Sequence, residues 1–80
     1  MKYKVGDKVR IKVLDEVKRK HPQLGYNDAM IQYEGQIHQI IDVDDYREQY
    51  KIKFPNEIRG RSHWFYKEEW LEDPIEFEAF

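Results

Sequence analysis

Residues 35–54, GQIHQIIDVDDYREQYKIKF, constrain the fold more than any other part of the chain. They have an apolar first half, an acidic turn, and a second half in which apolar residues alternate with lysines. Alternate side chains of a strand point to opposite faces of the sheet. We therefore predict a β-hairpin whose second strand carries Tyr50, Ile52 and Phe54 on its inner face and Lys51 and Lys53 on its outer face.

Two patterns compete in the first half of this hairpin. Ile37, Ile40 and Val43 recur every third residue, whereas Ile37, Ile41 and Val43 share parity. A regular strand cannot turn both sets inward, but a β-bulge near residues 39–40 reconciles them. Both patterns place Ile37 in the core.

The length and composition of the chain limit the size of the core and the cellular compartment that we expect. Eighty residues make one small domain, and aromatic residues, at 15% of the chain, allow a compact core with few aliphatic side chains. The chain has no cysteine, so it has no disulfide and no thiolate metal site. No secretory signal is visible, and no apolar run approaches the roughly 20 residues of a membrane helix. We therefore expect a cytoplasmic protein.

Three further segments read as strands. Residues 8–13 place Val9, Ile11 and Val13 on one face, and residues 61–66 form a short aromatic strand. Residues 68–72 fit a helical turn followed by a last small strand, with Trp70 and Leu71 closing one end of the fold.

The connections complete the prediction. A short helix is expected near residues 15–21, where Asp15 is a suitable N-cap and Pro22 ends the helix. Residues 22–34 form a long connection, which in a small domain is usually functional. The segment PNEIRG at residues 55–60 is predicted as a turn.

Five short strands in about 70 residues predict an all-β domain, a small antiparallel barrel with one helical insert. We expect residues 1–73 to form the barrel and residues 74–80 to form an acidic-aromatic tail. The charge is also unevenly placed: all fourteen Lys and Arg precede residue 68, and six acidic residues follow residue 67.

The motifs that run through this barrel resemble those of a known family. They are Val5-Gly6-Asp7-Lys8-Val9, then Gly35-Gln36-Ile37 with Ile40 and Val43, then Tyr50-Lys51-Ile52-Lys53-Phe54, then Trp64-Phe65 with Trp70-Leu71. Over residues 3–72 the chain resembles SH3-like barrels of the KOW, Tudor and Mind bomb kind. It is also similar to small phage and bacterial proteins that share the opening KVGDKVRIK. The resemblance implies a five-stranded antiparallel SH3-like barrel. It transfers no ligand residue, because Pro55-Asn56-Glu57 stands where the Mind bomb pattern has Trp-Asp-x-Gly.

The residue inventory argues against an enzyme. There is no Cys or Thr, and Ser62 is the only serine, with His63 on the opposite face of the same predicted strand. The three histidines have no spacing that would pre-arrange a metal, and no glycine-rich phosphate loop is present. We predict no catalytic residue, no metal and no cofactor.

An aromatic surface is the first candidate for binding. If Trp64 and Tyr66 point outward, they could form a groove or cage for a partner together with Tyr26, Tyr33 or Tyr46. If the two residues point inward, they belong to the core instead.

A basic surface is the second candidate. Lys51, Lys53, Arg59 and Arg61 lie within one hairpin and the start of the next strand, so they could contact the phosphates of a nucleic acid. Alternating lysines also keep an exposed strand soluble, and the pI of about 5.9 counts against a strong general nucleic-acid binder.

We therefore expect a non-enzymatic interaction module that binds a protein, of the accessory or regulatory kind found in phages and bacteria. The alternative is a nucleic-acid-binding domain of the KOW type. We expect a monomer or a weak homodimer without membrane contact.

Overall fold

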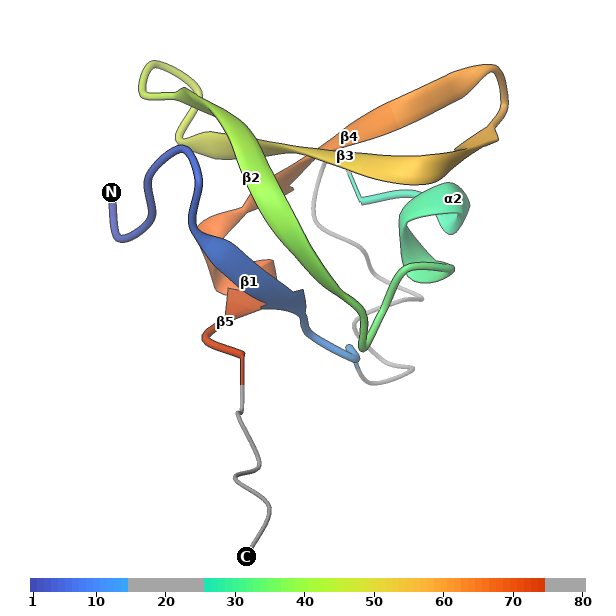
Figure 1. Cartoon of the computed structure of the whole chain (residues 1–80), viewed down its shortest axis with the longest axis horizontal. Coiled ribbons are helices and arrows are strands. Elements are labelled where there is room, and N and C mark those ends of the chain that lie inside the picture. The colour runs from blue at the N-terminus through green and yellow to red at the C-terminus, as the bar shows by residue number, and fades with distance from the viewer. Residues whose placement is uncertain (15–25, 75–80) are drawn as a thin grey trace, which may run out of the picture.

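The computed structural model describes residues 1–14 and 26–74 of the chain (Figure 1). Over these residues the strands are β1 (Lys8–Ile11), β2 (Ile37–Asp44), β3 (Gln49–Ile58), β4 (Arg61–Lys67) and β5 (Leu71–Glu72). A one-turn helix, α2 (Asp28–Ile31), precedes β2, and a 3₁₀ helix, η1 (Glu68–Trp70), lies between β4 and β5. The strands form one curled antiparallel sheet in the order β4-β3-β2-β1-β5, which confirms the predicted fold class.

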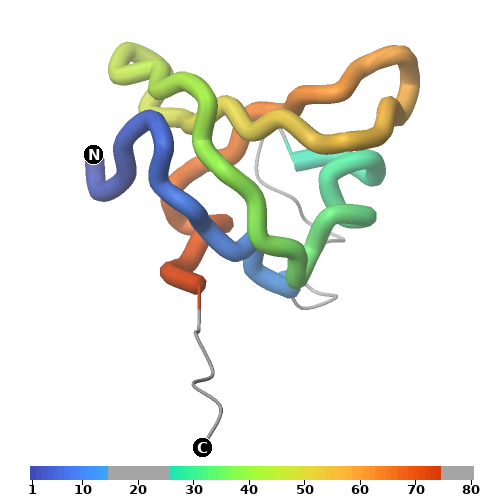
Figure 2. The backbone as a smooth tube through the Cα atoms, viewed as in Figure 1, coloured from blue at the N-terminus to red at the C-terminus, as the bar shows by residue number. Residues whose placement is uncertain are grey.

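Strand β2 links the two halves of the sheet. Its first residues pair with β1, its later residues pair with β3, and the register shifts between Ile40 and Asp42. Figure 2 shows the long oblique path of β2 between these neighbours. The predicted bulge is therefore present, one or two residues further along the strand. The bulge follows the buried Ile40 and lets Val43 pack against the core on the same side. Ile37 is 48% exposed, so the prediction that it lies in the core was wrong.

The hairpin of β3 and β4 is longer than predicted. Strand β3 continues to Ile58, and the turn is only Arg59-Gly60, where the sequence favoured a turn over residues 55–60. Both turn residues have positive φ, 56° and 74°, as the common two-residue hairpin turn with right-handed twist requires. The ladder has a register shift between Lys53 and Ile58, which lets β3 include Pro55. The hairpin consequently projects past the rest of the sheet and over α2 (Figure 1).

The core is largely aromatic, as composition predicted. Tyr50, Ile52 and Phe54 are all buried, which confirms the alternation of β3. The ring of Tyr33 stacks on Phe54, with centroids 3.6 Å apart and an angle of 10° between the ring planes. Trp70 and Leu71 are buried at the other end of the core, also as predicted.

Strand β1 is shorter than the predicted segment. Val9 and Ile11 are fully buried, but Val13 lies beyond the end of the strand and is 63% exposed. Parity holds only while the extended backbone continues, so Val13 leaves the face that Val9 and Ile11 share.

Helix α2 was not expected within the long connection. The Asn27 side chain caps it by accepting hydrogen bonds from the backbone N–H groups of Ala29 and Met30, at 2.9 and 3.2 Å. So short a helix is not stable alone, and packing holds it in place. Ala29 and Met30 are buried, and the Tyr66 hydroxyl donates to the Met30 carbonyl at 3.3 Å.

Hydrogen bonds attach the N-terminal residues to the sheet. The buried Tyr50 hydroxyl accepts the backbone N–H of Tyr3 at 3.0 Å and donates to the Glu68 carboxylate at 2.8 Å. The same carboxylate accepts the backbone N–H of Lys2 at 2.6 Å. These bonds, that of Lys2 first, lower the pKa of Glu68. Lys2 also forms an ion pair with Asp73 at 3.6 Å, so the start of the chain is tied to η1 and to the end of β5.

The helix expected near residues 15–21 and the tail expected over residues 74–80 fall, except for Pro74, outside the described residues. Both stay predictions, as does the boundary drawn between barrel and tail. In the part of the chain that the structure describes, no helix is long and apolar enough to cross a membrane.

Candidate functional site

The structure separates the five aromatic residues that were candidates for a partner-binding surface. Tyr26, Tyr33, Trp64 and Tyr66 are buried in the core, and only Tyr46 is exposed, at 94%. Trp64 and Tyr66 share the inner face of β4, so the interpretation that placed them in the core is the one that the structure supports. The rings of Tyr26, Tyr33 and Tyr66 pack on Phe54 or Trp70 in the core, so these residues do not form an exposed groove or cage.

The structure does bring basic residues together. Since Trp64 and Tyr66 point inward, their neighbours on β4 point outward and meet the outward lysines of β3. Lys51 lies opposite Phe65, and Lys53 lies opposite His63. We call this outer surface of the hairpin the basic face, and it comprises Lys51, Lys53, Arg61, His63, Phe65 and Lys67. Arg59 is exposed at the turn that ends the hairpin.

The cations of the basic face have no acidic partner among the described residues. The ion pairs in this part of the chain join Lys2 to Asp73, Arg10 to Glu72 and Arg47 to Asp44, all of them away from the basic face. Within the described residues, none of these cations lies within ion-pair distance of a carboxylate.

The pKa of His63 is affected by desolvation and by the positive charges around it. Desolvation lowers its pKa, and the nearby charges of Lys51 and Arg61 lower it further. Its Nε2 atom lies 3.4 Å from an Arg61 guanidinium nitrogen. The lowered pKa favours the neutral form of His63, so lysine and arginine supply most of the charge of the basic face.

Aromatic rings support three of these cations. The Arg61 guanidinium lies 4.8 Å from the centre of the Trp64 ring system, and the Lys67 ammonium lies 5.7 Å from that of Trp70. The Lys51 ammonium lies 6.0 Å from the Phe65 ring centre. Ring contacts of this kind position a cation and leave its charge available to a ligand.

A small hollow adjoins the basic face. Its volume is about 220 Å³, which is room for one or two side chains. Four of its lining residues are apolar and four are polar, and two of the polar ones are cations, Arg61 and Lys67. We call it the β4 hollow, and it is lined by Asn27, Met30, Gln49, Arg61, Trp64, Phe65, Lys67 and Trp70.

The sheet order, the bent β2 and the 3₁₀ helix before the last strand are consistent with a small SH3-like barrel. The family model of the Mind bomb SH3 repeat domain matches residues 3–70. The chain belongs to this family. Comparisons with curated proteins and with solved structures gave no significant match. An SH3-like domain suggests a module for protein interaction, and such domains are generally non-catalytic.

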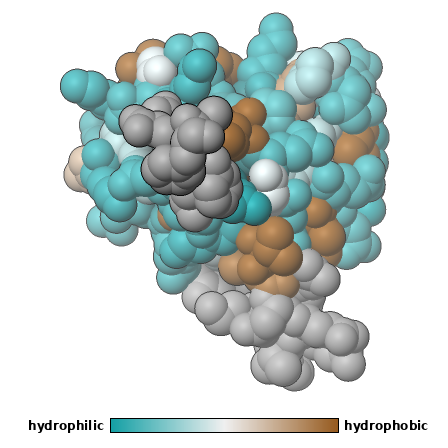
Figure 3. Space-filling model, turned by 60° about the horizontal axis from the view of Figure 1, so that its bottom comes forward, coloured by the Kyte–Doolittle hydropathy of each residue, from teal (hydrophilic) through white to brown (hydrophobic). Residues whose placement is uncertain are grey.

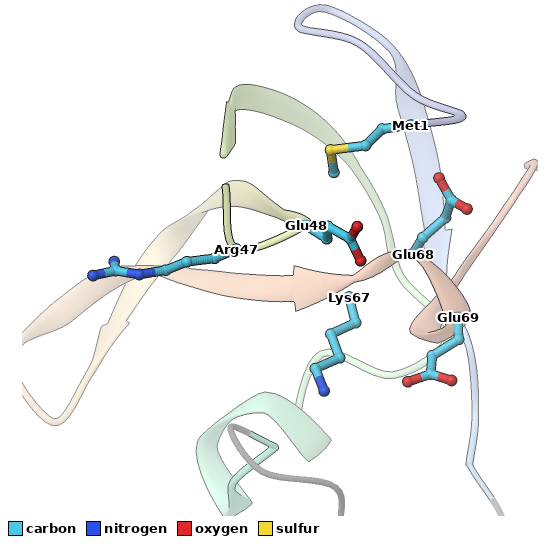
Figure 4. Close-up of a pocket in the computed structure, with 6 residues that line it drawn as sticks. All are labelled: Met1, Arg47, Glu48, Lys67, Glu68 and Glu69. Atoms are coloured by element: carbon cyan, nitrogen blue, oxygen red, sulfur yellow. The ribbon is translucent and has the colours of Figure 1, made fainter. Parts of the chain in front are cut away.

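This SH3 repeat domain has a second, larger hollow of about 540 Å³, lined by Met1, Arg47, Glu48, Lys67, Glu68 and Glu69 (Figure 4). Figure 4 shows the Glu48 and Glu68 side chains on one side of it and Arg47 directed away. Glu68 is already engaged by Lys2 and Tyr50, so this hollow is mainly a junction between the N-terminal residues and η1. Within residues 1–14 and 26–74, no group of three or more His, Asp or Glu residues is arranged to hold a metal.

The remaining surface offers no competing large apolar patch on the face that Figure 3 presents. Hydrophilic side chains predominate there, and hydrophobic residues form small patches. Exposed apolar residues such as Val5 and Ile41 are ordinary on the surface of a folded domain.

Sequence reasoning did not identify Phe65, Gln49 or Met30 as lining residues. The alternation in residues 61–66 places Phe65 on the face opposite to Trp64. Phe65 could therefore have been assigned to the outer face once Trp64 was known to point inward. Met30 gave no such signal, because its position depends on how α2 folds under the hairpin.

Proposed function

We propose that this SH3 repeat domain is a non-enzymatic module that binds a protein partner through the basic face and the β4 hollow. The observation that carries the proposal is a set of cations without ion-pair partners among the described residues, placed beside a hollow with a partly apolar lining. The resemblance to small phage and bacterial proteins favours an accessory or regulatory role in the cytoplasm.

The chemistry of this surface defines the partner. Complementary charge speeds the encounter of two proteins and selects against partners of the wrong sign. An apolar side chain that fills a hollow supplies the desolvated centre that most interfaces have. The surface is thus suited to an acidic segment that also carries an apolar residue.

The partner can be sought by affinity capture from a lysate of the source organism. The bait is compared with an Arg61→Glu/Lys67→Glu variant and with a Lys4→Glu/Lys8→Glu variant as a matched control. Both variants change the net charge equally, but Lys4 and Lys8 are exposed and lie outside the basic face. Circular dichroism first establishes that all three proteins are folded.

We expect a protein that the wild type and the control retain and that the Arg61→Glu/Lys67→Glu variant loses. Equal recovery of every captured protein by both variants would show that the basic face is not the binding surface. The control is what separates a specific surface from a general effect of net charge.

Nucleic acid is the second candidate ligand, because the same unpaired cations could contact phosphates. The cations that would carry it are Lys51, Lys53, Arg59 and Arg61 at the end and on the outer face of the hairpin. Affinity for single- and double-stranded oligonucleotides is measured as salt is raised from about 50 mM, where phosphate contacts are strongest. Absence of binding at the lowest salt excludes this candidate, and binding that survives Lys51→Glu/Lys53→Glu excludes these residues as the contacts.

A further inference from the structure

Strand β4 is an edge of the sheet. It is the first strand in the order β4-β3-β2-β1-β5, and within the described residues it pairs only with β3. Alternate backbone N–H and C=O groups on its other side are consequently left without a strand partner. Strand β4 has seven residues, whereas β5, at the opposite edge, has two. Long exposed edges are the places where an additional strand can pair.

The β4 hollow borders this edge strand, which supplies four of its lining residues. Trp64 and Phe65 are consecutive residues whose side chains point to opposite faces of β4, and both line the hollow. Gln49 of β3, which pairs with Lys67, also lines the hollow, so the hollow borders β4 near the end of its ladder with β3. Its far wall includes Asn27 and Met30, from the cap and the body of α2.

Extended segments have the right geometry for such a site. A segment paired with β4 would form main-chain hydrogen bonds along the edge and direct every second side chain to one face. One apolar side chain would then enter the hollow, and its neighbours would approach the cations at the rim.

Charge distinguishes among possible occupants. Arg61 and Lys67 stand at the rim of the hollow and have no acidic partner in the described part of the chain. An acidic strand is complementary to them. A second copy of this domain, paired through its own β4, would bring the same cations against one another, which is unfavourable across a sheet.

We propose that an extended acidic segment of a partner protein binds as an additional strand on the free edge of β4, with an apolar side chain in the β4 hollow. This mode of binding rests on the proposed function and adds to it the conformation and the composition of the partner segment.

The test uses the full chain and three synthetic peptides. The parent peptide is acetyl-Glu-Ile-Glu-Phe-Glu-Ile-Glu-amide, which alternates acidic and apolar residues. The second peptide has N-methyl groups on the backbone amides of its Ile and Phe residues, and the third has them on those of its internal Glu residues. Since alternate amides of a strand face the same edge, each methylated peptide has one edge blocked and the other intact. Isothermal titration calorimetry gives the affinities.

We expect the parent peptide to bind, and one methylated peptide to bind at least tenfold more weakly than the other. Arg61→Glu/Lys67→Glu should weaken binding of the parent peptide at least tenfold, whereas Lys4→Glu/Lys8→Glu should change it less than threefold. In NMR spectra, the largest amide shifts should fall on residues 61–67.

Each other outcome overturns a stated part of the proposal. One outcome is that both methylated peptides bind the wild type as well as the parent does, while Arg61→Glu/Lys67→Glu binds none of them. Strand addition is then wrong, but the basic face is still the surface that binds an acidic segment. If the parent peptide does not bind, the acidic strand is wrong, while the lysate capture still tests the module independently. If sedimentation shows a dimer that the peptide dissociates, the occupant of the edge is a second copy. If removal of residues 75–80 raises the affinity tenfold, the occupant is the chain's own end.

Discussion

Replacing Tyr50 with phenylalanine removes one oxygen atom that joins two distant parts of the chain. The hydroxyl accepts the backbone N–H of Tyr3 and donates to Glu68. The first of these bonds is buried, so the Tyr3 amide is left without a partner in the variant. A buried unpaired donor costs about 1–3 kcal/mol, and we expect Tyr50→Phe to lower the free energy of unfolding by about 2 kcal/mol.

Urea unfolding at pH 7, followed by the fluorescence of Trp64 and Trp70, measures this change. The dependence of the free energy on urea should be unaltered, because the core keeps its shape. Tyr46→Phe is the matched control, since this tyrosine is 94% exposed. If the two variants agree to within about 0.5 kcal/mol, a size typical of surface substitutions, the hydroxyl does not hold the N-terminal residues.

The same network predicts a dependence on pH. The pKa of Glu68 is lower in the folded protein, mainly because its carboxylate accepts the Lys2 amide and the Tyr50 hydroxyl. A lowered pKa means that the charged form favours folding, so the contribution is present above the unfolded pKa of about 4.5 and is lost as pH falls through the folded value. Glu68→Gln should therefore flatten the decline of stability below pH 5. An acid limb identical to that of the wild type would contradict this assignment.

Three further predictions concern the hairpin turn, the core and a histidine. Arg59→Asn should stabilise the protein by about 0.5–1 kcal/mol, because asparagine tolerates the positive φ better, whereas Gly60→Ala should destabilise it; thermal unfolding that ranks them in the opposite order would contradict the turn assignment. Phe54→Ala should cost about 3–5 kcal/mol in urea unfolding, since it removes a buried ring stacked by Tyr33, and the exposed-site control Val5→Ala should cost less than about 0.5 kcal/mol. Burial lowers the pKa of His38, so its contribution to stability is present above about pH 6.5 and is lost as pH falls through the folded pKa; an NMR titration that gives a value above 6.5 would refute this.

Much of the sheet could be predicted because its signals are local. The period of two in residues 50–54 and 61–66 is a property of the extended backbone, and it correctly paired Trp64 with Tyr66 and Ile52 with Phe54 on common faces. The conflict between two apolar patterns in β2 revealed a bulge for the same reason. The pattern could not place the bulge to the residue, because either Ile40 or Ile41 could point inward in the predicted strand.

The candidate site was predicted less well because it depends on contacts between distant segments. Lys51 and Arg61 were recognised as basic neighbours, but the β4 hollow is made by residues of β3, β4, α2 with its cap, and η1. The sequence placed Tyr33 in a long connection, where it was a candidate for an exposed binding surface. Its burial follows from the position of Phe54, on which it stacks, some twenty residues later in the chain.

The sequence by itself determined the class of fold, the strands around the aromatic core and the lysines that point away from it, because alternation is set by the backbone of each strand. The tertiary structure alone decided which face of β4 is buried and where β3 ends. It also decided that the hydroxyl of Tyr50 holds the amide of Tyr3 and that the edge of β4 lies beside a hollow. These features depend on contacts between segments that are distant in the sequence, and a local pattern of residues carries no information about such contacts.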